Sequence, residues 1–277
     1  MNDSTLDHLR TVADLPDLTG TRYEIESEIG RGGLGVVYAA LDSELGRRVA
    51  IKVLDSTDEA RVIANLEHPA IVPVYDAGTL PDGRAFYAMK LVDGIRLDHY
   101  AVKHRSVSES LHVIERIGEA LAFAHSRGVL HRDLKPQNVM IGSFGEVYVM
   151  DWGIAGVAGT PRFQSPEQER GARSEVDQRS DVYALGALLA FTLPENAPRA
   201  LKAVAAKAMR AKPDGRYASV SAMLLDLRRF EDGLAVDAFP ESVWQKSWRF
   251  ASRNRVLLAL LAAYVLVRVA LYFFRKF

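Results

Sequence analysis

A short segment near the middle of the chain carries three side-chain types that together suit phosphoryl transfer. Residues 131–138 read HRDLKPQN. The carboxylate of Asp133 can accept a hydroxyl proton, the amine of Lys135 can neutralise a phosphate, and the amide of Asn138 can hold a magnesium ion. Because phosphoryl transfer depends mostly on positioning and charge neutralisation, this segment could supply the centre of such a site.

A glycine-rich segment precedes it in the chain. Gly30, Gly32 and Gly35 stand in the pattern G-x-G-x-x-G-x-V. The pattern alone is weak evidence, because glycine turns are common and dinucleotide-binding loops look similar. Residues 23–29 and 36–40 are rich in β-formers, which favours a hairpin between strands over the strand-to-helix turn of a dinucleotide site. Glycines in such a hairpin let backbone amides approach phosphates.

Two charged residues follow apolar segments that read as strands. Lys52 stands seventeen residues after Gly35, and Asp151 stands eighteen residues after Asp133 and begins the sequence Asp-Trp-Gly. A lysine at a strand end is usually only solvated, and an Asp-x-Gly segment can be a simple turn. With the other two segments present, Lys52 is expected to pair with phosphates and Asp151 to hold magnesium.

In this order and spacing, the four segments resemble those of bacterial eukaryotic-like (Hanks-type) serine/threonine protein kinases. A fifth segment, residues 159–167, resembles the family's G-T-x-x-Y-x-A-P-E, with Phe163 in place of Tyr and Ser165 in place of Ala. The resemblance covers about residues 23–230, and Lys135 is similar to the lysine of the serine/threonine branch.

The resemblance implies an α+β fold of two lobes, a β-rich N-lobe with one helix and a mostly helical C-lobe. ATP, with magnesium or manganese, would lie between the lobes, and the γ-phosphate would pass to Ser or Thr of proteins, including other copies of the chain. The implied catalytic residues are Asp133, Lys135, Lys52 and Glu59, and the implied metal ligands are Asn138 and Asp151. The implied ATP contacts are Gly30, Gly32, Gly35, Val37, Ala50, Lys52, Met89 (the gatekeeper), Leu91 (in the hinge, 90–92) and Met140.

Two buried carboxylates are expected in the C-lobe. Glu167 should form a buried ion pair with Arg216, because a buried carboxylate requires a partner. Asp181 opens an apolar run, residues 182–193, which reads as a buried helix. Asp181 could cap that helix beside Ser180, and the resemblance implies that it also holds the backbone of the catalytic loop.

The helix expected after Lys52 is abbreviated. Only six residues separate Lys52 from Glu59, yet seven steps of extended chain reach about 23–25 Å, so an ion pair between them is feasible. The alternative is that Glu59 only completes a capping box with Ser56. In the ion-pair register, Ile63 would face the core beside Trp152 and His131.

Two further segments are shorter than is usual in the family. Residues 154–158 contain no hydroxyl group, so Arg132 has no evident activation-segment phosphate to meet. Residues 194–199 run almost directly into an expected helix at 200–211, where the family has a further helix that helps to dock substrates. An ATP-binding pseudokinase or scaffold is therefore the alternative to an active kinase. The presence of all the implied catalytic residues favours the enzyme.

The end of the sequence predicts a membrane anchor. Residues 256–274 carry one charge, Arg268, and twelve of the nineteen residues are Leu, Val or Phe. At about −0.3 to −0.6 kcal/mol each, these outweigh the roughly +2.5 to +3.5 kcal/mol of a central arginine, and a spanning helix needs about 20 apolar residues. A core or interfacial helix ending at Val267 is the alternative. Four basic residues before the segment and two after it favour a single-pass inner-membrane protein with the kinase in the cytoplasm and the C-terminus outside.

Composition sets the remaining limits. The chain has 277 residues, 48% hydrophobic and 25% charged, with zero net charge and no cysteine. These values give no indication of a nucleic-acid partner and exclude disulfides and thiolate metal sites. The expected organisation is a leader (1–22), the N-lobe with the hinge (23–92), the C-lobe (93–232), a juxtamembrane linker (233–255) and the membrane helix (256–274).

Overall fold

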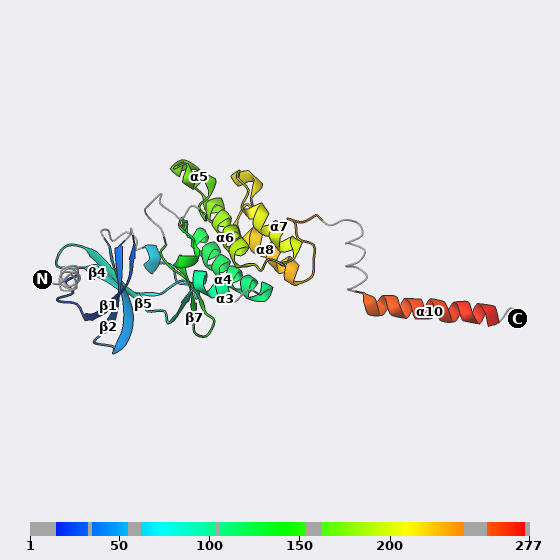
Figure 1. The fold of residues 1–277 in the computed structure, drawn as a ribbon, viewed down its shortest axis with the longest axis horizontal. Coiled ribbons are helices and arrows are strands. Elements are labelled where there is room, and N and C mark those ends of the chain that lie inside the picture. Colours follow the sequence, from blue (N-terminus) through cyan, green and yellow to red (C-terminus); the bar gives the residue numbers. More distant parts are fainter. Residues whose placement is uncertain are drawn as a thin grey trace.

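The computed structural model describes residues 15–32, 35–54, 62–103, 106–152, 162–240 and 254–274. Figure 1 shows a sheet-rich lobe followed by a helical lobe. The strands are β1 (Tyr23–Gly32), β2 (Gly35–Asp42), β3 (Arg47–Leu54), β4 (Val74–Thr79), β5 (Ala85–Lys90), β6 (Gly94–Arg96), β7 (Val139–Gly142) and β8 (Val147–Val149). The helices are α3 (Leu97–Lys103), α4 (Val107–Ser126), α5 (Pro166–Glu169), α6 (Gln178–Thr192), α7 (Arg199–Ala208), α8 (Val220–Glu231) and α10 (Arg255–Phe274), with short 3₁₀ turns η1 (Pro136–Asn138), η2 (Arg173–Glu175) and η3 (Pro213–Gly215).

The N-lobe is an antiparallel sheet of strand order β1-β2-β3-β5-β4. Strands β1 and β2 pair antiparallel from Tyr23–Asp42 to Gly32–Gly35, with register shifts after Ile25 and after Glu28, so the expected glycine hairpin is confirmed. Side chains alternate between the faces of a strand. Ile51 and Val53 of β3 accordingly join a cluster on one face, whereas Leu54 belongs to the core that continues into the C-lobe.

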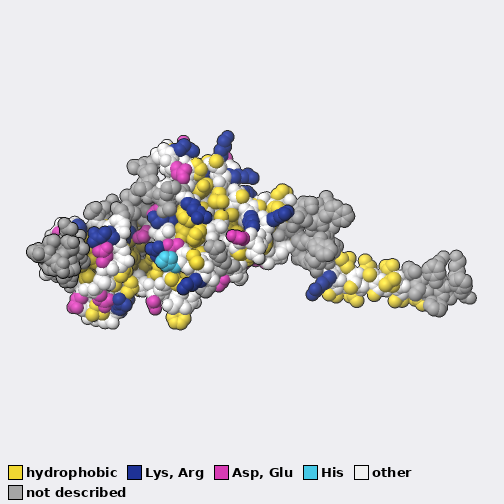
Figure 2. All heavy atoms as spheres, viewed as in Figure 1, with side chains coloured by type: hydrophobic (Ala, Val, Ile, Leu, Met, Phe, Trp, Pro, Cys, Tyr) yellow, Lys and Arg dark blue, Asp and Glu magenta, His cyan; other side chains and the backbone are white. Residues whose placement is uncertain are grey.

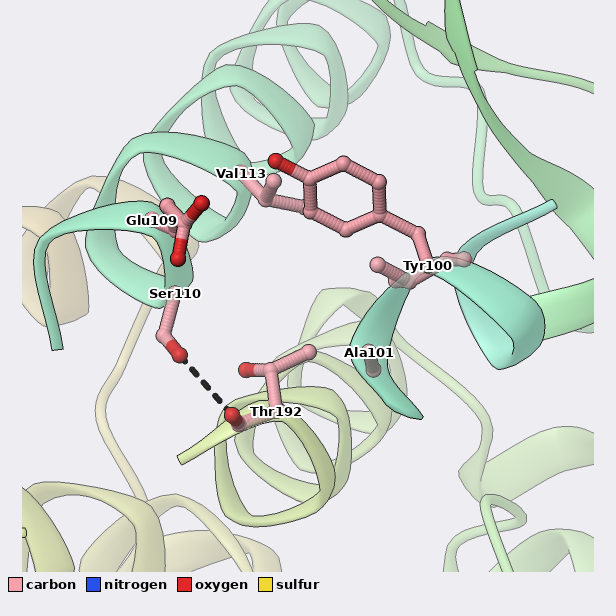
Figure 3. A pocket seen from close by; sticks show the side chains of 7 residues that line it. Tyr100, Ala101, Glu109, Ser110, Val113 and Thr192 are labelled. Carbon is pink, nitrogen blue, oxygen red and sulfur yellow. Dashed lines mark hydrogen bonds between the residues drawn. The ribbon is translucent and has the colours of Figure 1, made fainter. Parts of the chain in front are cut away.

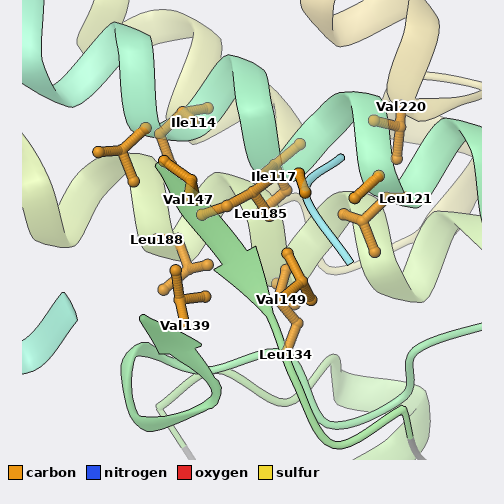
Figure 4. Packing of buried hydrophobic residues seen from close by; sticks show 14 of the residues in the cluster. Ile114, Ile117, Leu121, Leu134, Val139, Val147, Val149, Leu185, Leu188 and Val220 are labelled. Atoms are coloured by element: carbon orange, nitrogen blue, oxygen red, sulfur yellow. The ribbon is translucent and has the colours of Figure 1, made fainter. Parts of the chain in front are cut away.

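The C-lobe core lies between α4, α6 and the small sheet β6-β7-β8 (Figure 4). Ile114, Ile117 and Leu121 recur on one side of α4 at the spacing of a helical face and are fully buried. They pack in one cluster with Val149 of β8 and Leu185 of α6. This packing fixes β8, and with it the segment that carries Asp151.

Helix α6 begins one turn earlier than the apolar run indicated. Its N-cap is Asp177, whose carboxylate accepts the backbone N–H of Arg179 at 2.7 Å. The interpretation of Asp181 as the N-cap was therefore wrong, because a better-placed Asp already caps the helix. The helix itself is the buried central helix that the apolar run predicted.

The short connection after α6 is confirmed. Helix α6 ends at Thr192 and α7 begins at Arg199, so six residues join them. Helix α7 ends at Ala208 and does not continue to residue 211. Met209 is its C-cap, and the backbone N–H of Met209 donates to the carbonyls of Ala205 and Lys207.

Helix α10 continues from Arg255 to Phe274, and its described side chains are mainly exposed and apolar (Figures 1 and 2). Among the described residues, no helix combines the length and the hydropathy that crossing a membrane requires.

Candidate active site

The catalytic loop gathers its polar side chains around Asp133. Lys135 donates from Nζ to Asp133 Oδ2 at 2.7 Å, and Asn138 donates from Nδ2 to the same oxygen at 3.2 Å and to the Asp133 carbonyl at 2.9 Å. Within the described residues, both side-chain bonds fall on Oδ2, which leaves Oδ1 to accept a hydroxyl proton. Lys135 can then also approach a phosphate, so the loop can orient an acceptor and neutralise charge.

Asp181 holds this loop from behind. Its carboxylate accepts the backbone N–H groups of His131 and Arg132, each at 2.9 Å, and contacts His125 Nε2 at 2.7 Å. Burial, the largest influence, would raise the pKa of the Asp181 carboxyl, but the bonds from His125 and His131 outweigh it and lower that pKa. The implied role of Asp181 at the catalytic loop is therefore confirmed. Reasoning from sequence missed His125, which gave no signal because a histidine on α4 also reads as an ordinary helix residue.

The backbone turns sharply at both charged motifs. Arg132 has φ 66° and Asp151 has φ 54°, the left-handed region that non-glycine residues rarely adopt. Such strain persists only where surrounding contacts fix it. At Arg132, the residue before Asp133, the bond from the backbone N–H to Asp181 provides this constraint.

Lys52 and Asp151 meet between the lobes. Lys52 Nζ donates to Asp151 Oδ1 at 2.9 Å, although the two residues are 99 positions apart in the sequence. Lys52 is 3% exposed and is therefore not a solvated strand end, whereas the Asp151 side chain remains 35% exposed. The structure therefore joins the third strand of the N-lobe to the Asp-Trp-Gly segment, as a shared phosphate and metal site requires.

Four of the implied ATP contacts lie on one face of the N-lobe sheet. Val37 pairs with Lys52 across β2 and β3, and Ala50 pairs with Met89 across β3 and β5. Directly paired residues and residues two apart on a strand share a face. Val37, Ala50, Lys52 and Met89 therefore share the face on which Lys52 meets Asp151.

The remaining implied ATP contacts occupy the hairpin, the hinge and the C-lobe sheet. Leu91 directly follows β5, and Met140 lies half-buried on β7. A Cβ at Gly30 or Gly32 would meet nothing within 4 Å, so both glycines face open space. Gly35 differs, because its φ is 129° and a Cβ there would lie 2.1 Å from the Val53 carbonyl oxygen.

The donor set suits magnesium. Asp151 offers carboxylate oxygens and Asn138 an amide oxygen, and oxygen ligands are those that magnesium prefers. The orientation fits as well, because Asn138 uses its amide nitrogen for Asp133 and so keeps its oxygen as a ligand. Among the described residues, no group of three or more His, Cys, Asp or Glu could hold a metal ion. Asn138 and Asp151 are the residues that would hold magnesium when ATP is bound.

The predicted ion pair between Glu167 and Arg216 is confirmed. Arg216 donates from Nη1 and Nη2 to the two carboxylate oxygens at 2.6 and 2.7 Å, and both side chains are buried. Ser180 adds a bond to Glu167 at 2.7 Å. Burial, the largest influence, would raise the pKa of Glu167, but the Arg216 and Ser180 bonds lower it to about 2. This pair fixes α5 to the start of α6 and to the segment before α8.

The aromatic at the position after Asp151 packs as expected. Trp152 is 1% exposed, and its ring lies 4.8 Å from that of His131. Ile63 is buried in the same hydrophobic cluster as Trp152, which agrees with the predicted position of Ile63. Burial lowers the pKa of His131, so its imidazole is neutral at pH 7.

Several sequence predictions lie outside the described residues. These are the ion pair of Glu59, its alternative capping box with Ser56, and the segment 154–158.

Two contacts near the site were not predicted from the sequence. Gln168 Nε2 donates to the Arg132 carbonyl at 2.6 Å, which ties α5 to the catalytic loop. Lys90, the first hinge residue, donates to the Tyr148 hydroxyl of β8 and lies 4.5 Å from that ring's centroid. Glutamines and lysines are usually solvated, so only the fold shows these partners.

A small hollow between α3, α4 and α6 is not part of this site. Tyr100, Glu109 and Val113 line it, and the Ser110 hydroxyl donates to the Thr192 carbonyl at 2.9 Å (Figure 3). None of the implied catalytic or ATP-binding residues lies in its wall.

Comparison with known proteins identifies the class. The family model for the protein kinase domain matches residues 23–214, and the chain therefore belongs to the protein kinase family. A solved structure similar to it is the kinase domain of Mycobacterium tuberculosis PknI, with 29% identity and a TM-score of 0.61 over 78% of this chain and 98% of that one.

Curated relatives place the chain beside bacterial serine/threonine kinases. It is 34% identical to the serine/threonine-protein kinase PknB of Mycolicibacterium smegmatis, over 80% of this chain and 45% of the relative. It is 40% identical to a probable serine/threonine-protein kinase PknB of Lactococcus lactis, over 61% of this chain and 31% of the relative. The chain thus spans less than half the length of these relatives.

Proposed function

We propose that the chain is an ATP-dependent serine/threonine protein kinase. The observation that carries the proposal is the arrangement of Asp133, with one carboxylate oxygen held by Lys135 and Asn138. The backbone N–H of Met150 donates to the Asn138 carbonyl at 2.9 Å, which joins this loop to the Asp151 that pairs with Lys52. Both halves of a phosphoryl-transfer site, the acceptor side and the phosphate side, are therefore represented by charged groups in contact.

Each residue has one task in the proposed reaction. The acceptor hydroxyl of Ser or Thr donates its proton to Asp133 as its oxygen bonds to the γ-phosphorus. The bond from that phosphorus to the bridging oxygen breaks, and ADP leaves with the electron pair. Lys135 and Lys52 neutralise the transferred and remaining phosphates, while Asn138 and Asp151 would hold magnesium, which supplies further charge neutralisation.

Replacing Asp133→Asn tests this assignment. Asparagine keeps the size of the side chain but cannot accept the proton, so transfer should fall by 10²-fold or more, of the order expected for a general base. ATP affinity, measured by calorimetry, should remain near the wild-type value because the phosphate contacts persist. Wild-type-like phosphorylation by Asp133→Asn would contradict the assignment. Nucleotide binding without transfer in the wild-type chain would instead support the pseudokinase or scaffold alternative.

Membrane anchoring is the second part of the proposal. Helix α10 has 20 residues, and its exposed side chains are apolar ones such as Val256, Leu260, Leu266 and Leu271, with Arg255 and Arg268 as the exceptions. A helix with so large an apolar surface is stabilised by an apolar surrounding. The excess of basic residues on the N-terminal side would keep the kinase in the cytoplasm, where ATP is available.

Alkaline extraction tests the anchor. Full-length chain should stay with the membrane fraction in carbonate and be released only by detergent. A chain truncated after Arg255 should be released in buffer and still bind ATP. Autophosphorylation of the anchored form should be faster at equal dilution, since the membrane raises the effective concentration of neighbouring copies. Release of the full-length chain by carbonate would refute anchoring without affecting the assignment of Asp133.

A further inference from the structure

Helix α7 presents an exposed face whose charged residues are all basic. Its buried side carries Leu201, Val204, Ala205 and Ala208. The other side and the segment after it carry Arg199, Lys202, Lys207, Arg210 and Lys212, which we call the basic face. Residues 199–212 contain no Asp or Glu, although the whole chain has zero net charge. Five positive charges in one short segment repel one another, and an anionic partner would relieve that repulsion.

Within the described part of the chain, none of these five residues has a carboxylate partner. The nearest acid that follows them in sequence, Asp214, pairs instead with Arg179 at 2.5 Å. Arg228 and Arg229 of α8 pair with Glu119 and with Asp237. These three neighbouring arginines are thus each paired with a carboxylate of the same chain. Among the described residues, the positive charges of the basic face are not paired in this way.

The basic face is connected to the point where the chain leaves the C-lobe. Lys207 lies 4.2 Å from the ring centroid of Tyr217, whose hydroxyl donates to the buried carboxylate of Asp226 at 2.7 Å. Asp226 also accepts the backbone N–H groups of Asp237 and Ala238, at 2.6 and 3.0 Å. Tyr217 and Asp226 therefore connect Lys207 of α7 to the segment at residues 237–238, which leads toward α10.

We propose that the basic face lies against anionic phospholipid headgroups of the membrane that anchors the chain. The inference rests on the proposed anchoring by α10, because the exit segment held by Asp226 is the part of the C-lobe nearest in sequence to that helix. Basic residues next to a membrane segment are attracted to the negative cytoplasmic leaflet, and the attraction falls off within a Debye length. An acidic substrate peptide would be the other anionic occupant. It is disfavoured because α7 lies at the C-lobe end remote from the N-lobe and the interlobe site (Figures 1 and 2).

A single reporter on α7 tests the contact in the full-length chain. The protein has no cysteine, so Ala206→Cys, at an exposed position among the basic residues, takes one environment-sensitive fluorophore. Phe144→Cys, at a side chain that is 94% exposed on the turn after β7, serves as the control. On vesicles containing phosphatidylglycerol, the label at 206 should shift to the blue and resist quenching by acrylamide. The label at 206 should show neither change on phosphatidylcholine vesicles. The label at 144 should show neither change on either kind of vesicle.

Charge removal provides the second arm. The triple variant Arg199→Gln, Lys202→Gln, Arg210→Gln should lose the protection at position 206. The matched variant Arg48→Gln, Lys103→Gln, Arg127→Gln, which removes the same charge elsewhere, should keep it. The inference would be overturned if the label at position 206 showed the same emission and the same acrylamide quenching on both kinds of vesicle. So would a triple variant that loses phosphorylation of an acidic peptide without any lipid effect, since the face would then dock substrates.

The two proposals fail separately. A chain that resists carbonate but shows no lipid-dependent protection at position 206 keeps its anchor and refutes the basic-face contact. A chain released by carbonate that is still protected on phosphatidylglycerol vesicles refutes the anchor and supports the contact.

Discussion

Replacing Glu167→Gln isolates the charge of the buried ion pair from its shape. Glutamine has nearly the same volume and can still accept a bond from Arg216 or Ser180. What it removes is the negative charge opposite a guanidinium that is itself buried. Removing one partner of a buried pair leaves an uncompensated charge, which costs about 3–5 kcal/mol.

The pKa of Glu167 gives a second measure of the same quantity. The carboxyl is held from its usual value of 4.5 down to about 2. Each pKa unit corresponds to about 1.4 kcal/mol, so the ionised form is favoured in the folded protein by about 3 kcal/mol. The two figures agree in order of magnitude. We therefore expect Glu167→Gln to lower the free energy of unfolding by about 3 kcal/mol at pH 7.

The same pair predicts a pH dependence. Because the folded-state pKa lies below the unfolded one, the contribution of Glu167 is fully present above pH 4.5. It is lost progressively as the pH falls toward about 2. The difference in stability between wild type and Glu167→Gln should therefore shrink below pH 4.5 and be near its full size at pH 7.

Urea unfolding followed by circular dichroism measures the effect. The matched control is Glu169→Gln, on the same helix α5 but exposed, where the change should stay within about 0.5 kcal/mol. If Glu167→Gln and Glu169→Gln unfold at the same urea concentration, the buried pair does not stabilise the C-lobe and the reasoning fails.

Three further predictions concern the site. Gly35→Ala should disturb β2–β3 pairing and lower the thermal unfolding midpoint, since a Cβ there lies 2.1 Å from a backbone oxygen; Gly32→Ala should leave that midpoint unchanged. Asp181→Asn weakens the bonds to two loop amides and should lower kcat about 10²-fold with little change in ATP affinity, measured by steady-state kinetics and calorimetry. Lys90→Met and Tyr148→Phe remove one shared contact, so the double variant should raise the KM for ATP no more than either single variant does.

The sequence predicted that the polar side chains of residues 131–138 lie together because their spacing is local. Asp133, Lys135 and Asn138 stand within six residues, so one loop brings them together whatever the rest of the fold does. The hairpin of Gly30–Gly35 followed from the β-formers on either side. The Glu167–Arg216 pair was predictable for a different reason: a buried charge demands a partner, and the resemblance indicated where to look.

Other contacts could not be predicted because the sequence around these residues does not indicate their partners. Asp177 and Asp181 are both acceptable N-caps, and only the backbone geometry shows that Asp177 is the cap while Asp181 serves the catalytic loop. His125 and Gln168 read as ordinary surface residues of helices. Their partners lie 56 and 36 residues away, a separation over which no periodicity or spacing carries information.

The contacts around α5 tie this helix to the catalytic loop. Helix α5 is held by the Glu167–Arg216 pair and by the bond from Gln168 to the Arg132 carbonyl. The backbone of Arg132 is held in turn by Asp181. In this arrangement ion-paired and hydrogen-bonded groups fix the catalytic loop to the start of α5, so no added phosphate is required at that junction. Residues 154–158 also contain no hydroxyl group to phosphorylate, and we expect phosphatase-treated protein to keep its rate of phosphoryl transfer.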